Sequence, residues 1–90
     1  MIRRMSESTP SGPAPLPDLP HITPGRYRHY KGLDYEVLGV VRHSETLAPM
    51  VLYRPLYQSA DPASLWVRPF EMFVGTVETG GLPVRRFAPT

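Results

Sequence analysis

The chain has 90 residues, twelve of them proline, seven glycine and none cysteine, and it carries a net charge of +2. Without cysteine there is no disulfide framework, no Cys-based zinc site and no thiol nucleophile. The ten basic and eight acidic residues are interspersed rather than clustered. No apolar run approaches the roughly 18–20 residues of a membrane span, and no secretory signal follows the N-terminus. We therefore expect a cytoplasmic protein without a membrane partner.

Half of the prolines fall in residues 1–24, which contain no aromatic residue. Proline removes a backbone donor and fixes φ, so neither a helix nor a central strand persists there. We therefore predict a disordered, Pro-rich arm over residues 1–24, with polyproline II as its local conformation. Two PxxP spacings, Pro10–Pro13 and Pro17–Pro20, match a weak recognition pattern, and a solubilising tail is the plainer interpretation.

Short β-type segments fill residues 25–90, each bounded by glycine, proline or polar turn residues. The expected strands are residues 26–30, 35–41, 50–54, 65–68, 76–78 and 83–87. Apolar residues on both faces make 35–41 a central strand, and Gly39 within it predicts a bulge or bend. Residues 69–74 are expected to form a single helical turn or a bent strand, and no window supports a long helix. The pattern predicts a mainly β domain, a small five- to six-stranded and mostly antiparallel barrel that is partly open.

Several strings in this region also resemble a family of short bacterial proteins, domain-of-unknown-function family 1653. The strings are Gly25-Arg26-Tyr27-Arg28-His29-Tyr30-Lys31-Gly32, Tyr35-Glu36-Val37, His43-Ser44-Glu45-Thr46, Val51-Leu52-Tyr53, Leu56-Tyr57, Trp66-Val67-Arg68-Pro69, Met72-Phe73 and Arg86-Phe87. The resemblance spans residues 25–90 and implies an SH3-like barrel, without an activity to carry over. Ala48 and Gly75 depart from it, because acidic residues are expected at both positions.

The His43-Ser44-Glu45-Thr46 string is the first candidate site. In an extended chain His43 and Glu45 share one face, where the carboxylate would orient the imidazole and raise its basicity. This arrangement supports a small hydrolase-type enzyme as one alternative. The other reading is a structural turn, in which the Ser44 and Thr46 hydroxyls bond to nearby backbone and Glu45 is exposed.

Two further candidates combine aromatic and cationic side chains. Arg28 and Tyr30 share a strand face, a pattern that would stack nucleobases and contact phosphate, although an ordinary edge strand produces the same alternation. Trp66 and Arg68 also share a face and would recognise an anion or a peptide. The alternative is a core tryptophan, with Arg68 in a salt bridge.

No recognised metal-ligand spacing joins the three histidines, so we expect neither a metal nor a cofactor. We interpret the domain as a non-enzymatic binding module for a protein or peptide, and leave its oligomeric state open. Its predicted groove consists of His29, Tyr30, His43, Glu45, Tyr53, Tyr57, Trp66 and Arg68. The alternatives are the enzyme using His43 and Glu45, and a weak binder of RNA or single-stranded nucleic acid. The latter predicts one basic surface formed by Arg26, Arg28, Lys31, Arg42, Arg54, Arg85 and Arg86.

Overall fold

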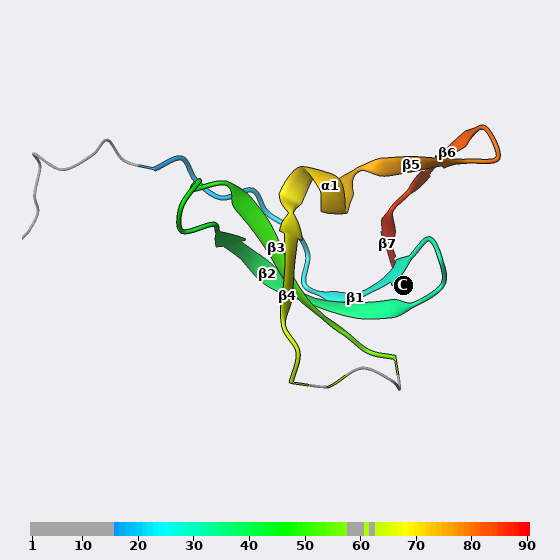
Figure 1. The fold of residues 1–90 in the computed structure, drawn as a ribbon, viewed down its shortest axis with the longest axis horizontal. Coiled ribbons are helices and arrows are strands. Elements are labelled where there is room, and N and C mark those ends of the chain that lie inside the picture. Colours follow the sequence, from blue (N-terminus) through cyan, green and yellow to red (C-terminus); the bar gives the residue numbers. More distant parts are fainter. Residues whose placement is uncertain (1–15, 58–60, 62) are drawn as a thin grey trace, which may run out of the picture.

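A computed structural model describes residues 16–57, 61 and 63–90 of the chain. These residues form seven strands and one short helix (Figure 1). In chain order they are β1 (Gly25–His29), β2 (Asp34–Arg42), β3 (Pro49–Pro55), β4 (Trp66–Pro69), α1 (Phe70–Val74), β5 (Thr76–Thr79), β6 (Leu82–Arg85) and β7 (Phe87–Pro89).

Five strands form one antiparallel sheet in the order β4-β3-β2-β1-β7. The predicted strand at 35–41 is confirmed as the central one, because β2 lies between β1 and β3. The bulge predicted at Gly39 is also confirmed: the β2–β3 register shifts between Val37 and Gly39. Proline ends both β3 and β4, at Pro55 and Pro69, because it cannot donate to a further ladder bond.

The second sheet is the hairpin of β5 and β6, which projects away from the five-stranded sheet (Figure 1). The sequence predicted one strand over residues 83–87, but the chain changes sheets at Arg86. There β6 pairs with β5, whereas β7 pairs with β1. The prediction of a mainly β, antiparallel domain is confirmed, although no pairing among the described strands joins β4 to β7, so the five-stranded sheet is not closed into a barrel.

Helix α1 confirms the helical alternative for residues 69–74. It buries one residue, Phe73, against the sheet. It is five residues long, and among the described residues no helix has the length and apolar character to cross a membrane.

The core is largely aromatic, as expected for a small sheet that must bury area with few residues. The buried hydrophobic residues are Ile22, Tyr27, Tyr35, Val37, Val51, Tyr53, Phe73 and Phe87. Tyr35 and Val37 on β2, like Val51 and Tyr53 on β3, are two positions apart, so each pair points to the same side of the sheet. This side, the inner face, carries the core.

The N-terminal segment contributes to this core before the first strand begins. Residues 16–24 form neither helix nor strand, but Ile22 is only 9% exposed and belongs to the core cluster. The Tyr27 hydroxyl donates to the Thr23 carbonyl over 2.8 Å, and Nη2 of Arg42 donates to the Pro17 carbonyl over 2.7 Å. The packed unit therefore begins before the predicted boundary at Gly25, and residues 1–15 of the predicted arm lie outside the described residues.

Candidate binding site

A group of aromatic side chains meets at one end of the inner face, which we call the aromatic cluster. It consists of His29, Tyr35, Tyr53, Tyr57, Trp66 and Phe87. The β3–β4 register sets Trp66 directly opposite Tyr53, with their ring centroids 6.1 Å apart. Tyr35 lies at the centre, with its ring 6.0 Å from Trp66 and 5.7 Å from Tyr57. Most contacts in the cluster are edge-to-face, the arrangement that aromatic quadrupoles favour.

Arg68 joins the cluster from the outermost strand. Its Nε donates to the Tyr53 hydroxyl over 3.3 Å, and its guanidinium lies 5.5 Å from the Phe87 ring centroid. A planar guanidinium over an aromatic face is a stabilising cation–π arrangement. The described carboxylates include no ion-pair partner of Arg68, so its guanidinium lies beside aromatic rings without an anion among the described residues.

The electrostatics of the cluster follow from burial and from this cation. Burial, aided by hydrogen bonding with Tyr57, raises the pKa of Tyr35 to about 12. The pKa of His29 is lowered, first by burial and then by the positive charges of Arg68, Lys31 and Arg86. The site thus keeps a neutral phenol and favours a neutral imidazole within a net positive field.

His43 and Glu45 lie at the opposite end of the β2–β3 hairpin, in the turn that joins the two strands. Nδ1 of His43 accepts hydrogen bonds from the backbone N–H groups of Glu45 at 3.0 Å and Thr46 at 3.2 Å. The Glu45 side chain is exposed, and its carboxylate forms no hydrogen bond or ion pair with His43. These bonds fit the turn alternative, because the nitrogen that would meet a carboxylate already accepts backbone donors.

The structure thus divides the eight predicted groove residues. It brings five of them together: His29, Tyr53, Tyr57, Trp66 and Arg68. Tyr30 lies beside this group, with its ring centroid 4.5 Å from that of His29. His43 and Glu45 lie outside it, and among the described residues no three His, Cys, Asp or Glu side chains approach one another closely enough to hold a metal ion.

Two cluster members, Tyr35 and Phe87, were absent from the predicted groove. Tyr35 was placed on the central strand, where an aromatic alternating with Val37 indicates the inner face. Phe87 ends the Arg86-Phe87 string, and its role depends on the change of sheet at Arg86, for which the local pattern gives no signal.

The nucleic-acid alternative requires seven cations on one surface, but the structure distributes them over different parts of the domain. Arg42 binds the Pro17 and Leu47 carbonyls at the hairpin end that carries His43. Arg54 forms an ion pair with Glu36, and Arg28 one with Asp34. The basic groups near His29 therefore form a local positive patch and not a continuous basic surface along which a nucleic-acid strand could bind.

Comparison with known proteins identifies relatives of this chain. The model of a family described as protein of unknown function, DUF1653, matches residues 25–89. The crystal structure of a protein belonging to DUF1653 from Bordetella bronchiseptica is similar, with 41% sequence identity and a TM-score of 0.68, over 77% of this chain and 87% of that one. No curated protein matches the chain.

Proposed function

Because the chain belongs to the DUF1653 family, whose description assigns no activity, we propose a role from the geometry itself: the domain is a non-enzymatic module that binds an extended peptide along the outer edge of β4. The single observation that carries this proposal is the outer edge of β4, which has no ladder partner among the described strands, carries the exposed Val67 and is backed by the aromatic cluster.

The edge position of β4 supports strand addition. Among the described strands β4 pairs with β3 alone, which leaves its other side without a ladder partner. Natural edge strands are commonly protected by charged residues or bulges, because unpaired backbone groups recruit another chain. In β4 the apolar Val67 is 51% exposed, and Leu65, just before the strand, is 58% exposed. The other edge, β7, is only three residues long and ends at Pro89.

The side chains of β4 supply the specificity that backbone pairing lacks. Trp66 and Arg68 share the inner face, where Trp66 remains 39% exposed over the buried Tyr53. Arg68 uses its Nε for the Tyr53 hydroxyl, and its other guanidinium donors, which bond to no described residue, suit a carboxylate. The partner that fits is therefore an extended peptide with apolar side chains and an acidic one for Arg68.

The test is an NMR titration of the full chain with the peptide acetyl-Val-Glu-Val-Glu-Val-amide and with its Val-Lys counterpart. We expect amide shifts at residues 65–68 and in the Trp66 indole, and weaker binding of the lysine peptide. Val67→Lys places a charge on the edge and should weaken binding at least tenfold. Leu82→Lys makes the same change at an exposed leucine of β6 and should leave binding unchanged.

Three results would contradict the proposal. The first is a set of shifts confined to other surfaces, and the second is equal loss of binding in Val67→Lys and Leu82→Lys. The third is a concentration-dependent dimer, measured by analytical ultracentrifugation, that Val67→Lys abolishes and the peptide does not disrupt. That result would assign the edge to a second copy of the chain.

A further inference from the structure

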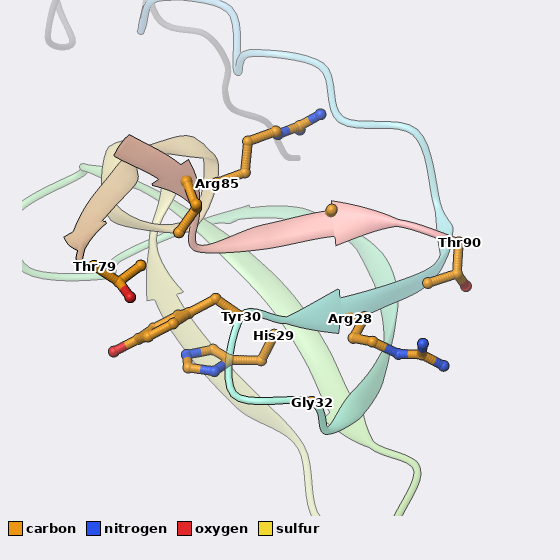
Figure 2. Close-up of a pocket in the computed structure, with 9 residues that line it drawn as sticks. Arg28, His29, Tyr30, Gly32, Thr79, Arg85 and Thr90 are labelled. Carbon is orange, nitrogen blue, oxygen red and sulfur yellow. The ribbon is translucent and has the colours of Figure 1, made fainter. Parts of the chain in front are cut away.

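A pocket of about 660 Å³ lies beside β1, β6 and β7, and none of its lining residues belongs to β4. The β1 end supplies Arg28, His29 and Tyr30, and β6 supplies Arg85. Ala88 of β7, the register partner of Arg28, also lines it. In Figure 2, Tyr30 and His29 stand side by side at one end, Arg28 extends toward the other end, and Arg85 lies along a third side.

The two arginines of the pocket differ in their partners. Arg28 is held by Asp34 through two hydrogen bonds of 2.7 and 3.2 Å. Arg85 forms no ion pair with any described carboxylate, including Glu78, which lies two residues from Thr76, the register partner of Arg85. Arg85 is thus an exposed cation beside the pocket, and its guanidinium donors form no hydrogen bond with a described residue.

Tyr30 gives the pocket a flat apolar surface. Its side chain is 41% exposed, a high value for an aromatic that neighbours a core. The His29 ring supports it at a centroid distance of 4.5 Å and an angle of 35°, and Phe87 in turn contacts His29 at 4.9 Å. The His29 ring holds Tyr30 from one side, and a planar group can stack on the exposed ring in place of the Lys31 ammonium, which lies over it 5.9 Å from its centroid.

The field at this positive patch favours an anion. Burial lowers the pKa of His29, and the positive charges of Arg68, Lys31 and Arg86 lower it further. Positive potential focused on a concave surface raises the local concentration of negative ligands. The volume lies within the range of about 300–1,000 Å³ that is usual for small-molecule sites.

We propose that this pocket binds a mononucleotide-type ligand, in which a planar base stacks on Tyr30 and a phosphate monoester pairs with Arg85. Arginine matches phosphate with two parallel hydrogen bonds, and aromatic stacking tolerates any base. A compact ligand fits better than a long strand, because Arg42 and Arg54 lie elsewhere and are engaged by protein groups.

The proposal is tested by NMR titration of the full chain with AMP, UMP, inorganic phosphate and adenosine. We expect AMP and UMP to shift the amides of Tyr30, Gly32, Arg85 and Ala88, and adenosine to bind at least tenfold more weakly. Nearby phosphate should also raise the pKa of His29, followed through its ring protons, because a new anion opposes the three cations. Arg85→Gln should weaken AMP binding about tenfold or more, as expected for a lost charge-assisted hydrogen bond.

Matched variants distinguish binding of AMP in the pocket from a general effect of the net charge on AMP binding. Arg26→Gln removes the same charge from β1 at a residue that does not line the pocket, and should leave AMP binding within twofold. Tyr30→Ala should weaken AMP binding five- to tenfold, whereas Tyr30→Phe should not. The side chains of Arg85, Arg26 and Tyr30 are exposed, so we expect the variants to keep the fold. The dispersion of their amide signals in the NMR spectrum checks this.

Four results would overturn the proposal: no shifts at millimolar AMP, equal binding of adenosine and AMP, equal losses in Arg85→Gln and Arg26→Gln, or affinity for oligothymidylates that rises steadily with length. The last would replace the compact site with a strand-binding surface. Because the peptide titration reads residues 65–68 and this one reads the patch around Tyr30, failure of either leaves the other measurement intact.

Discussion

Phe73 and Phe87 stack face to face, with ring centroids 4.0 Å apart and planes at 5°. The other ring pairs formed by these two residues are edge-to-face. Phe73 is the one buried residue of α1, and Phe87 begins β7, which follows the β5–β6 hairpin. The β5–β6 hairpin leaves the five-stranded sheet after α1 and returns to it at β7. The stack therefore joins the two ends of this segment.

The first prediction concerns this stack. Phe73→Leu and Phe87→Leu should each lower the free energy of unfolding by roughly 1–3 kcal/mol, because each removes contacts from a filled core. A double-mutant cycle in urea should give a coupling of about 0.5–1.5 kcal/mol. Additive losses would show that the two rings contribute through their separate environments. Met72→Leu, at the exposed neighbouring position, is the control.

The second prediction concerns Gly75, at the end of α1. A Cβ built there lies 2.8 Å from the Glu71 carbonyl oxygen, and the backbone (φ −77°, ψ −175°) is open to any residue. Gly75→Ala should thus cost about 1–3 kcal/mol through that contact alone, measured by urea unfolding. Thr76→Ala, one residue on, should change stability by less than about 0.5 kcal/mol. An unchanged Gly75→Ala stability would mean that the helix end relaxes freely.

The same contact bears on the family resemblance, in which an acidic residue is expected at position 75. Any side chain there requires the carbonyl of Glu71 to move. We expect Gly75→Asp to lose at least as much stability as Gly75→Ala, and a gain instead would show that the helix end adopts a second arrangement.

The third prediction is a dependence of stability on acid. Asp34 accepts two hydrogen bonds from Arg28, which lowers the pKa of this carboxyl below its ordinary value of 3.8. A folded pKa below the unfolded one means that the ionised group stabilises the fold above the unfolded pKa, and that this stability is lost as the pH falls through the folded value. Asp34→Asn should therefore flatten the acid side of the stability curve.

Urea midpoints measured from neutral pH down to below pH 3.8 give that curve. Asp18→Asn provides the control, since Asp18 is exposed and forms no ion pair with a described residue. Parallel curves for wild type and Asp34→Asn would show that the pair has no net effect. The pair lies at the surface, so the contribution should also shrink as salt is added.

The fourth prediction concerns Leu47, which has a φ of 64° in the turn after His43. Its N–H donates to the His43 carbonyl over 2.8 Å, which holds it in the left-handed region. This conformation costs roughly 1–2 kcal/mol for a residue with a Cβ. Leu47→Gly should therefore raise the free energy of unfolding by about 0.5–1 kcal/mol, after the added freedom of the unfolded chain.

Leu33→Gly makes the same replacement at an exposed turn leucine without a positive φ, and should not stabilise the protein. If both variants lose stability equally, the Leu47 side chain makes contacts that outweigh its backbone cost.

The sequence predicts correctly those features of the fold that depend on the backbone chemistry of a single residue. Pro55 and Pro69 end strands because they lack a donor, and Gly39 marks the bulge because it lacks a Cβ. The change of sheet at Arg86 has no such mark. Residues 83–87 alternate like one strand, and whether a strand continues or leaves depends on which neighbour its backbone meets.

In the candidate site too, local features are predictable from the sequence and long-range contacts are not. Trp66 and Arg68 were placed on one face correctly, because alternation along a strand is a local property. The distance from His43 to Trp66 is set by the register of three strands and by the length of a hairpin, which residue types do not reveal. Residue types alone therefore group His43 and Glu45 with the aromatics, whereas the β2–β3 hairpin carries them to its other end.

The burial of Ile22 has a consequence for how the domain is joined to other polypeptides. The family match starts at residue 25, three residues after Ile22. A chain trimmed to that start would keep every described strand and still lose the buried Ile22 side chain, together with the Thr23 carbonyl that accepts the Tyr27 hydroxyl. A fusion made directly at Gly25 would remove a core side chain and the acceptor of the Tyr27 hydroxyl, so any linker belongs upstream of Pro17, whose carbonyl accepts a hydrogen bond from Arg42.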